Sequence, residues 1–149
     1  MSLNTDTNRI YEIPHDTNSL PIEENTKIYE GALVGRTIDG YARPLQAGDN
    51  AVGFAKEHTD NSNGAKGDKN VDVKATGKIS LFISGIALSD VGARVYATDD
   101  NTFTLTDAGN SYVGKLVRFE RSDYGIVAFD FLTSEETAAT QTTTTESQE

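Results

Sequence analysis

Gly31-Ala32-Leu33-Val34, followed by Thr37, Asp39, Ala47-Gly48 and Val52-Gly53, is the stretch that decides the fold, because the chain repeats it. The pattern returns 61 positions later, without a gap, as Gly92-Ala93-Arg94-Val95, Thr98, Asp100, Ala108-Gly109 and Val113-Gly114. Each copy reads as a strand, a tight turn, a second short strand, an Ala-Gly corner and a Val-Gly strand start. Two copies of such a unit predict an all-β fold, either a small β-barrel or a β-sandwich with an internal strand-turn-strand duplication.

Apolar or β-branched runs separated by turn residues continue this pattern on both sides of the repeat. We expect strands at 28–37, 41–45, 51–56, 71–76, 78–84, 94–98, 102–106, 113–120 and 124–132. Residues 86–91 could form one helical turn at most. The large core members expected are Phe54, Phe82, Phe103, Phe119, Phe129, Phe131 and Tyr96. The regular short strands again favour a sandwich or barrel.

The chain divides by composition into three parts. We expect residues 1–26 to form an extended N-terminal arm, residues 27–132 the β domain, and residues 133–149 an acidic, Thr-rich tail without a large apolar residue. Of the formal net charge of −10, the arm carries −4, the tail −4 and the β domain −2. The acidic balance disfavours nucleic-acid binding, and no apolar run is long enough to span a membrane.

The residues give little sign of catalysis, so we expect no enzyme, no catalytic residues, no metal and no cofactor. There is no cysteine, and the two histidines, His15 and His58, accompany no nucleophile elbow. The segment Asp60-Asn61-Ser62-Asn63-Gly64 lacks the spacing of a calcium loop, and Gly64-Ala-Lys-Gly-Asp-Lys lacks the ending of a phosphate-binding loop. The start of the chain has no signal-peptide pattern, which predicts a protein that is not secreted.

A family pattern runs through the first copy. The order Glu30-Gly31-Ala-Leu-Val, Asp39-Gly40-Tyr41-Ala, Ala47-Gly48-Asp49, Ala51-Val52-Gly53-Phe54-Ala55, Gly67-Asp68, Val71-Asp72-Val73-Lys74 and Gly77 resembles the head decoration, or capsid cement, proteins of tailed bacteriophages. Gly125-Ile126-Val127-Ala128-Phe129, at the end of the second copy, fits as well. The resemblance covers residues 27–132.

The resemblance implies a structural virion protein, made in the host cytoplasm, that binds the outside of an expanded capsid as a homotrimer. Its partner would be the major capsid protein, whose neighbouring subunits it would bridge. The arm would then be the clamp, because its apolar residues are too sparse to fold alone and could be buried on docking. The capsid-contact candidates are Ile10, Tyr11, Ile13, Pro14, Leu20, Pro21 and Ile22.

An alternative places function in the polar loop 57–70, which the second copy lacks. Long loops often carry binding residues, so the chain could be a carbohydrate- or receptor-binding β domain of a phage fibre or surface protein. The loop-binding candidates are His58, Asp60, Asn61, Asn63 and Lys66. The loop has no aromatic residue to stack on a sugar, and the chain has no Trp.

Overall fold

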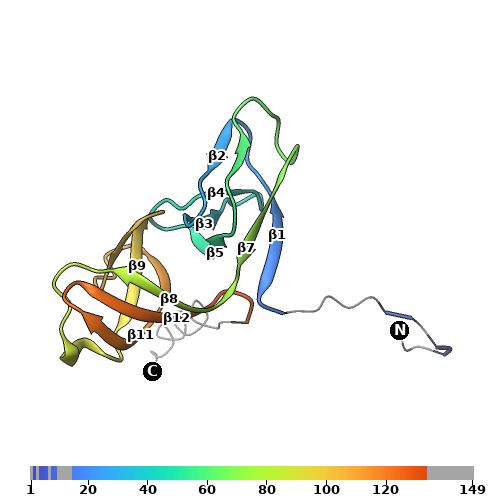
Figure 1. Cartoon of the computed structure of the whole chain (residues 1–149). Coiled ribbons are helices and arrows are strands. Elements are labelled where there is room, and N and C mark those ends of the chain that lie inside the picture. Colours follow the sequence, from blue (N-terminus) through green and yellow to red (C-terminus); the bar gives the residue numbers. More distant parts are fainter. Residues whose placement is uncertain (1, 3, 7, 10–14, 134–149) are drawn as a thin grey trace, which may run out of the picture.

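Alternation of apolar and polar residues sets the strands, and β7 (Asn70–Lys74) shows this most clearly. Val71 and Val73 are fully buried, whereas Asp72 and Lys74 are exposed on the opposite face. The computed structural model describes residues 2, 4–6, 8–9 and 15–133. Their strands form two five-stranded antiparallel sheets and a two-stranded ribbon (Figure 1). The expected all-β class is therefore confirmed, with sandwich-like sheets and no closed barrel within the described residues.

The first sheet contains, in spatial order, β1 (Thr17–Pro21), β7, β5 (Asn50–Ala55), β3 (Leu33–Arg36) and β4 (Ala42–Pro44). The second contains β8 (Thr76–Phe82), β12 (Tyr124–Asp130), β11 (Ser111–Arg121), β9 (Arg94–Asp99) and β10 (Thr102–Thr104). The ribbon pairs β2 (Thr26–Ile28) with β6 (Thr59–Asn61). Among the described residues there is one 3-10 turn, η1 (Leu88–Asp90), which lies where one helical turn was expected.

The two sheets repeat one strand arrangement. At an offset of 61 residues, β3, β4 and β5 correspond to β9, β10 and β11, and the strand order of the two sheets is the same. Hydrogen bonds repeat as well. Gly31 N–H donates to the Ala55 carbonyl, and Gly92 N–H donates to the Leu116 carbonyl at the same offset. The duplication read from the sequence is therefore a duplication of structure.

The repeat begins earlier than expected, at β1. Ser19-Leu20 and Ile22 recur as Ser80-Leu81 and Ile83, and β1 pairs with β7 as β8 pairs with β12. Residues 17–26 therefore do not belong to an extended arm, a correction to the expected boundary. Pairing with β7 satisfies backbone groups of β1, and full burial of Ile22 removes its side chain from water. We call residues 17–74 the first unit and residues 76–130 the second unit.

The glycine of the Ala-Gly corner has a positive φ in both units, although Ala108 also has a positive φ and Ala47 does not. Gly48 and Gly109 have φ angles of +93° and +82°, in the left-handed region that favours glycine. Beside them, Asp49 N–H donates to the carbonyl of Gln46, and Asn110 N–H donates to that of Asp107. The repeated Ala-Gly pair thus marks a turn that requires glycine.

Each unit buries side chains at matching positions. The buried pairs are Ile22 and Ile83, Val34 and Val95, Ala55 and Leu116, and Val73 and Val127. Of the aromatic residues expected in the core, Phe54, Phe103 and Phe129 are buried, and Phe119 and Phe131 are partly buried against them. Phe82 differs, because its side chain is 52% exposed. It lies on the other face of the second sheet.

The first unit docks onto the core of the second unit through Leu33, Leu45 and Phe54. The Phe54 ring lies 5.1 Å from that of Phe129 and 6.3 Å from that of Phe103, between ring centroids. The equivalent residues of the second unit, 61 positions later, are Arg94, Thr106 and Lys115, all exposed. The apolar residues thus occur only in the copy whose face is covered.

The turn between β9 and β10 adds a polar contact between the units, because Leu33 N–H donates to the Asp100 carbonyl at 2.9 Å. Partial burial, and then the neighbouring Asp99 charge, raise the pKa of the Asp100 carboxyl. A raised pKa means that the ionised form destabilises the fold. This loss of stability is present at neutral pH, where the Asp100 carboxyl is ionised. It disappears as the pH falls below the folded-state pKa and then below the unfolded-state pKa.

We therefore expect Asp100→Asn to raise the Tm by about 1–3 °C at pH 7 and to leave it unchanged near pH 3, measured by differential scanning calorimetry. Asp107→Asn, at an exposed position in the next turn, is the control and should change the Tm at neither pH. An equal rise in the Tm of Asp100→Asn at both pH values would contradict destabilisation by the ionised Asp100 carboxyl.

Candidate functional site

The polar loop 57–70 is built onto the first sheet and contains a short strand. Its β6 residues pair with β2, Thr26 opposite Asn61 and Ile28 opposite Thr59, to form the ribbon beyond the end of the sheet (Figure 1). The fully buried Ile28 anchors this ribbon in the core of the first unit. A segment expected as a loop is thus partly a strand, because β2 supplies the backbone partner that its own sequence does not predict.

The loop and the segment that follows β1 are held together. Ile22 N–H donates to the carbonyl of Lys69, and Gly67 N–H donates to that of Ile22, both at 2.9 Å. Asn25 N–H donates to the Gly64 carbonyl at 3.2 Å. The two regions singled out in the sequence, the end of the arm and the loop, are therefore one structural element.

Asn61 fixes the inside of this element. It is 2% exposed, and its side-chain amide donates to the carbonyls of Glu23 at 3.0 Å and Ala65 at 3.1 Å. Its Oδ1 has no hydrogen-bond partner among the described residues. Gly64 packs so closely on it that an added Cβ would lie 2.0 Å from this oxygen. Asn61 is thus a structural residue rather than an accessible binding residue.

We expect Asn61→Ala to lower the free energy of unfolding by about 1–3 kcal/mol, because the buried amide that donates to the carbonyls of Glu23 and Ala65 is removed. Urea denaturation measures this change. The matched control is Asn63→Ala in the same loop, at an exposed position, which should change stability by less than about 0.5 kcal/mol. Equal effects of the two variants would contradict a structural role for Asn61.

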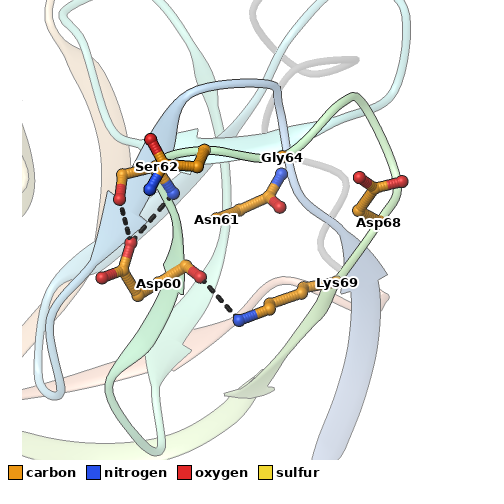
Figure 2. A pocket seen from close by; sticks show the side chains of 7 residues that line it. Asp60, Asn61, Ser62, Gly64, Asp68 and Lys69 are labelled. Carbon is orange, nitrogen blue, oxygen red and sulfur yellow. Dashed lines mark hydrogen bonds between the residues drawn. The ribbon is translucent and has the colours of Figure 1, made fainter.

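A shallow pocket of about 370 Å³ opens between the two sides of the loop (Figure 2). It is lined by Asp60, Asn61, Ser62, Asn63, Gly64, Asp68 and Lys69. Hydrogen bonds from the Ser62 hydroxyl and N–H lower the pKa of the Asp60 carboxyl, and Lys69 Nζ donates to the Asp60 carbonyl at 2.9 Å. Asp68 accepts from Ala65 N–H. These polar groups are largely occupied in holding the loop, so the pocket can offer a small polar ligand few free partners.

The remaining loop candidates lie on its surface. Lys66 Nζ is 3.8 Å from carboxylate oxygens of both Glu23 and Asp39, and lies 5.5 Å from the centre of the Tyr41 ring. The ring of the exposed His58 packs edge-on against Tyr29, with centroids 5.2 Å apart. His58 and Lys66 do not line the pocket, whereas Asp60, Asn61 and Asn63 do.

The capsid-contact candidates fall into two groups. Ile10, Tyr11, Ile13 and Pro14 lie outside the described residues. Leu20 and Pro21 are half-buried in β1, and Ile22 has no exposed surface. In this conformation Ile22 contributes to the core of the first unit and offers no surface to a partner.

Sequence reasoning missed a group of basic side chains that the register of the second sheet brings onto one face. The cations are scattered along the chain, and only the strand pairing places them together. The alternation within 78–84 was the signal that could have suggested an outward-facing row.

No group of three or more His, Cys, Asp or Glu side chains in the described part of the chain could hold a metal ion. The same residues include no helix long and apolar enough to cross a membrane. Comparison with models of known protein families found no match, and comparison with curated proteins found no significant match. The functional argument therefore rests on the residues and on their geometry.

Proposed function

We propose that the chain is a structural virion protein that binds the outside of an expanded phage capsid as a homotrimer and stabilises it by bridging major capsid subunits. The observation that carries the proposal is the anchoring of β1, an edge strand that pairs along its whole length with β7. In the sequence, the apolar residues Ile10, Tyr11, Ile13 and Pro14 precede this strand. An apolar segment attached to a rigid edge suits a clamp that is buried only on docking.

The attachment point is fixed by contacts around Asp16. Its carbonyl accepts a hydrogen bond from Ala75 N–H at 2.8 Å, and its carboxylate lies 3.2 Å from Lys74 Nζ. The hydrogen bond from Lys74 lowers the pKa of the Asp16 carboxyl. A docked segment would therefore transmit load from the capsid to the first sheet at β1. Three such segments in a trimer would raise avidity without a large single contact.

Co-sedimentation with expanded heads tests the clamp. The variant Ile10→Ser, Tyr11→Ser and Ile13→Ser should lose most of its head binding, because the apolar surface of the clamp is removed. The matched control, Asn4→Ser, Asp6→Ser and Asn8→Ser, should bind as the wild type does. Wild-type binding by the first variant would contradict the proposed clamp.

Light scattering coupled to size-exclusion chromatography tests the oligomer separately. The trimer should have three times the 16.1 kDa mass of the chain. A monomer at all concentrations would contradict the trimer.

The second candidate, a carbohydrate- or receptor-binding domain, would place its ligand in the pocket of loop 57–70. A glycan array distinguishes the two functions when wild type is compared with Asp68→Ala and with the exposed control Asp72→Ala. Specific glycan binding that is lost only in Asp68→Ala would favour the binding domain. The absence of such binding, together with head binding, favours decoration.

A further inference from the structure

The outer face of the second sheet gathers all five basic side chains of the second unit, in a chain whose net charge is −10. Strand register places Arg94 opposite Lys115, Lys115 opposite Ala128, and Ala128 opposite Lys78, so this row lies on one face. Arg118 opposes Ile126, and Arg121 opposes Tyr124. Because Ala128, Ile126 and Tyr124 are every second residue of β12, their partners lie on the same face. We call this surface, defined by Lys78, Arg94, Lys115, Arg118, Arg121 and Phe82, the basic face.

In the first unit, the equivalent face of the sheet packs against the second unit. In the first sheet, Leu33 opposes Phe54 and Phe54 opposes Lys74, which matches the row of Arg94, Lys115 and Ala128. Leu33 and Phe54 are buried in the contact between the two units. This face of the sheet is thus covered at Leu33 and Phe54 in the first unit, although Lys74 remains exposed there. In the second unit the equivalent row is exposed and carries cations.

Three cations of the basic face are available to a partner. Within the described residues, Lys78, Lys115 and Arg118 form no ion pair. Arg121 differs, because its Nη1 lies 3.6 Å from Oε1 of Glu120, a residue whose Oε1 also accepts from the Ser80 hydroxyl on this face. A partner that carries negative charge would pair with the three remaining cations.

Apolar and aromatic groups accompany the cations. Phe82 is 52% exposed and packs edge-on against Tyr124, with centroids 5.4 Å apart. The Arg121 guanidinium lies 4.0 Å from the centre of the Tyr124 ring, and Val117 is 39% exposed. Arginine and aromatic residues together are typical of protein interfaces.

We infer that the basic face is a docking surface for an acidic protein surface. A protein partner is favoured over nucleic acid because the chain as a whole repels a long polyanion. At about 0.15 M salt the screening length is about 8 Å, so a local acidic patch interacts mainly with the nearby cations. This inference goes beyond the capsid role and does not depend on the clamp.

Fluorescence anisotropy with a labelled oligoglutamate peptide at about 0.15 M salt tests the inference on the full chain. The variant Lys78→Glu, Lys115→Glu and Arg118→Glu should bind at least about tenfold more weakly than wild type, because three surface charge pairs are reversed. The matched control, Lys27→Glu, Arg36→Glu and Lys56→Glu, changes the net charge equally at exposed positions of the first unit. It should bind within about twofold of wild type, and circular dichroism should show both variants folded.

Four results would overturn the inference. They are no binding of oligoglutamate by the wild type, equal losses in the two variants, tighter binding of single-stranded oligo-dT than of oligoglutamate, or binding seen only after removal of residues 134–149. The last result would assign the basic face to the chain's own acidic end.

Discussion

Deleting residues 1–26 is expected to unfold the first unit. The deletion removes β1, which pairs along its whole length with β7, and it removes the fully buried Ile22. Loss of one buried Ile side chain alone costs about 2–5 kcal/mol, and the exposed edge of β7 adds unpaired backbone groups. We expect a fall of more than about 4 kcal/mol in the free energy of unfolding, measured by urea denaturation, which is a large part of the stability of a domain this size.

Deleting only residues 1–14 is the control. It leaves Asp16, β1 and Ile22 in place, so stability should change by less than about 1 kcal/mol. The same protein should nevertheless fail to bind expanded heads if the clamp lies in these residues. A folded, stable protein after deletion of residues 1–26 would contradict the assignment of β1 to the repeated unit.

Phe54→Lys is the second large expected effect. The substitution places in the first unit the residue that occupies the equivalent position, Lys115, in the second. It removes an aromatic ring packed between Phe103 and Phe129, at a cost of about 3–5 kcal/mol, and it buries an ammonium group without a partner. Calorimetry should show a strongly lowered Tm or separate unfolding of the two units.

The reciprocal substitution, Lys115→Phe, tests whether the effect depends on the contact between the units. Lys115 is exposed, so its replacement should change the free energy of unfolding by less than about 0.5 kcal/mol. It should instead increase self-association, because it adds an apolar side chain to an exposed sheet face. Equal destabilisation by the two substitutions would contradict the docking of the first unit through Phe54.

Much of the fold was predictable because the repeated turns and the alternating strands act locally. Gly48 and Gly109 mark corners that require glycine, and the alternation in β7 and β8 reports which face is buried. β1 was missed because Thr17-Asn-Ser-Leu-Pro has no β-branched run and contains a proline. Pro21 is tolerated at an edge strand. Extending the offset of 61 residues to Leu20 and Ile22 would have found it.

The candidate site was less predictable, because burial and pairing depend on distant partners. Asn61 was selected as a polar loop residue, yet its amide holds the backbone of Glu23, which is 38 residues away in the sequence. β6 is polar and forms a strand only because β2 pairs with it. The basic face depends on the register of four strands, and no local pattern brings its residues together.

Cryo-electron microscopy of the full chain mixed with expanded heads tests the proposed function most directly. We expect added density on the outer capsid surface, with three copies grouped around local three-fold positions and each in contact with more than one major capsid subunit. Bare capsids in the presence of excess folded protein would contradict capsid decoration.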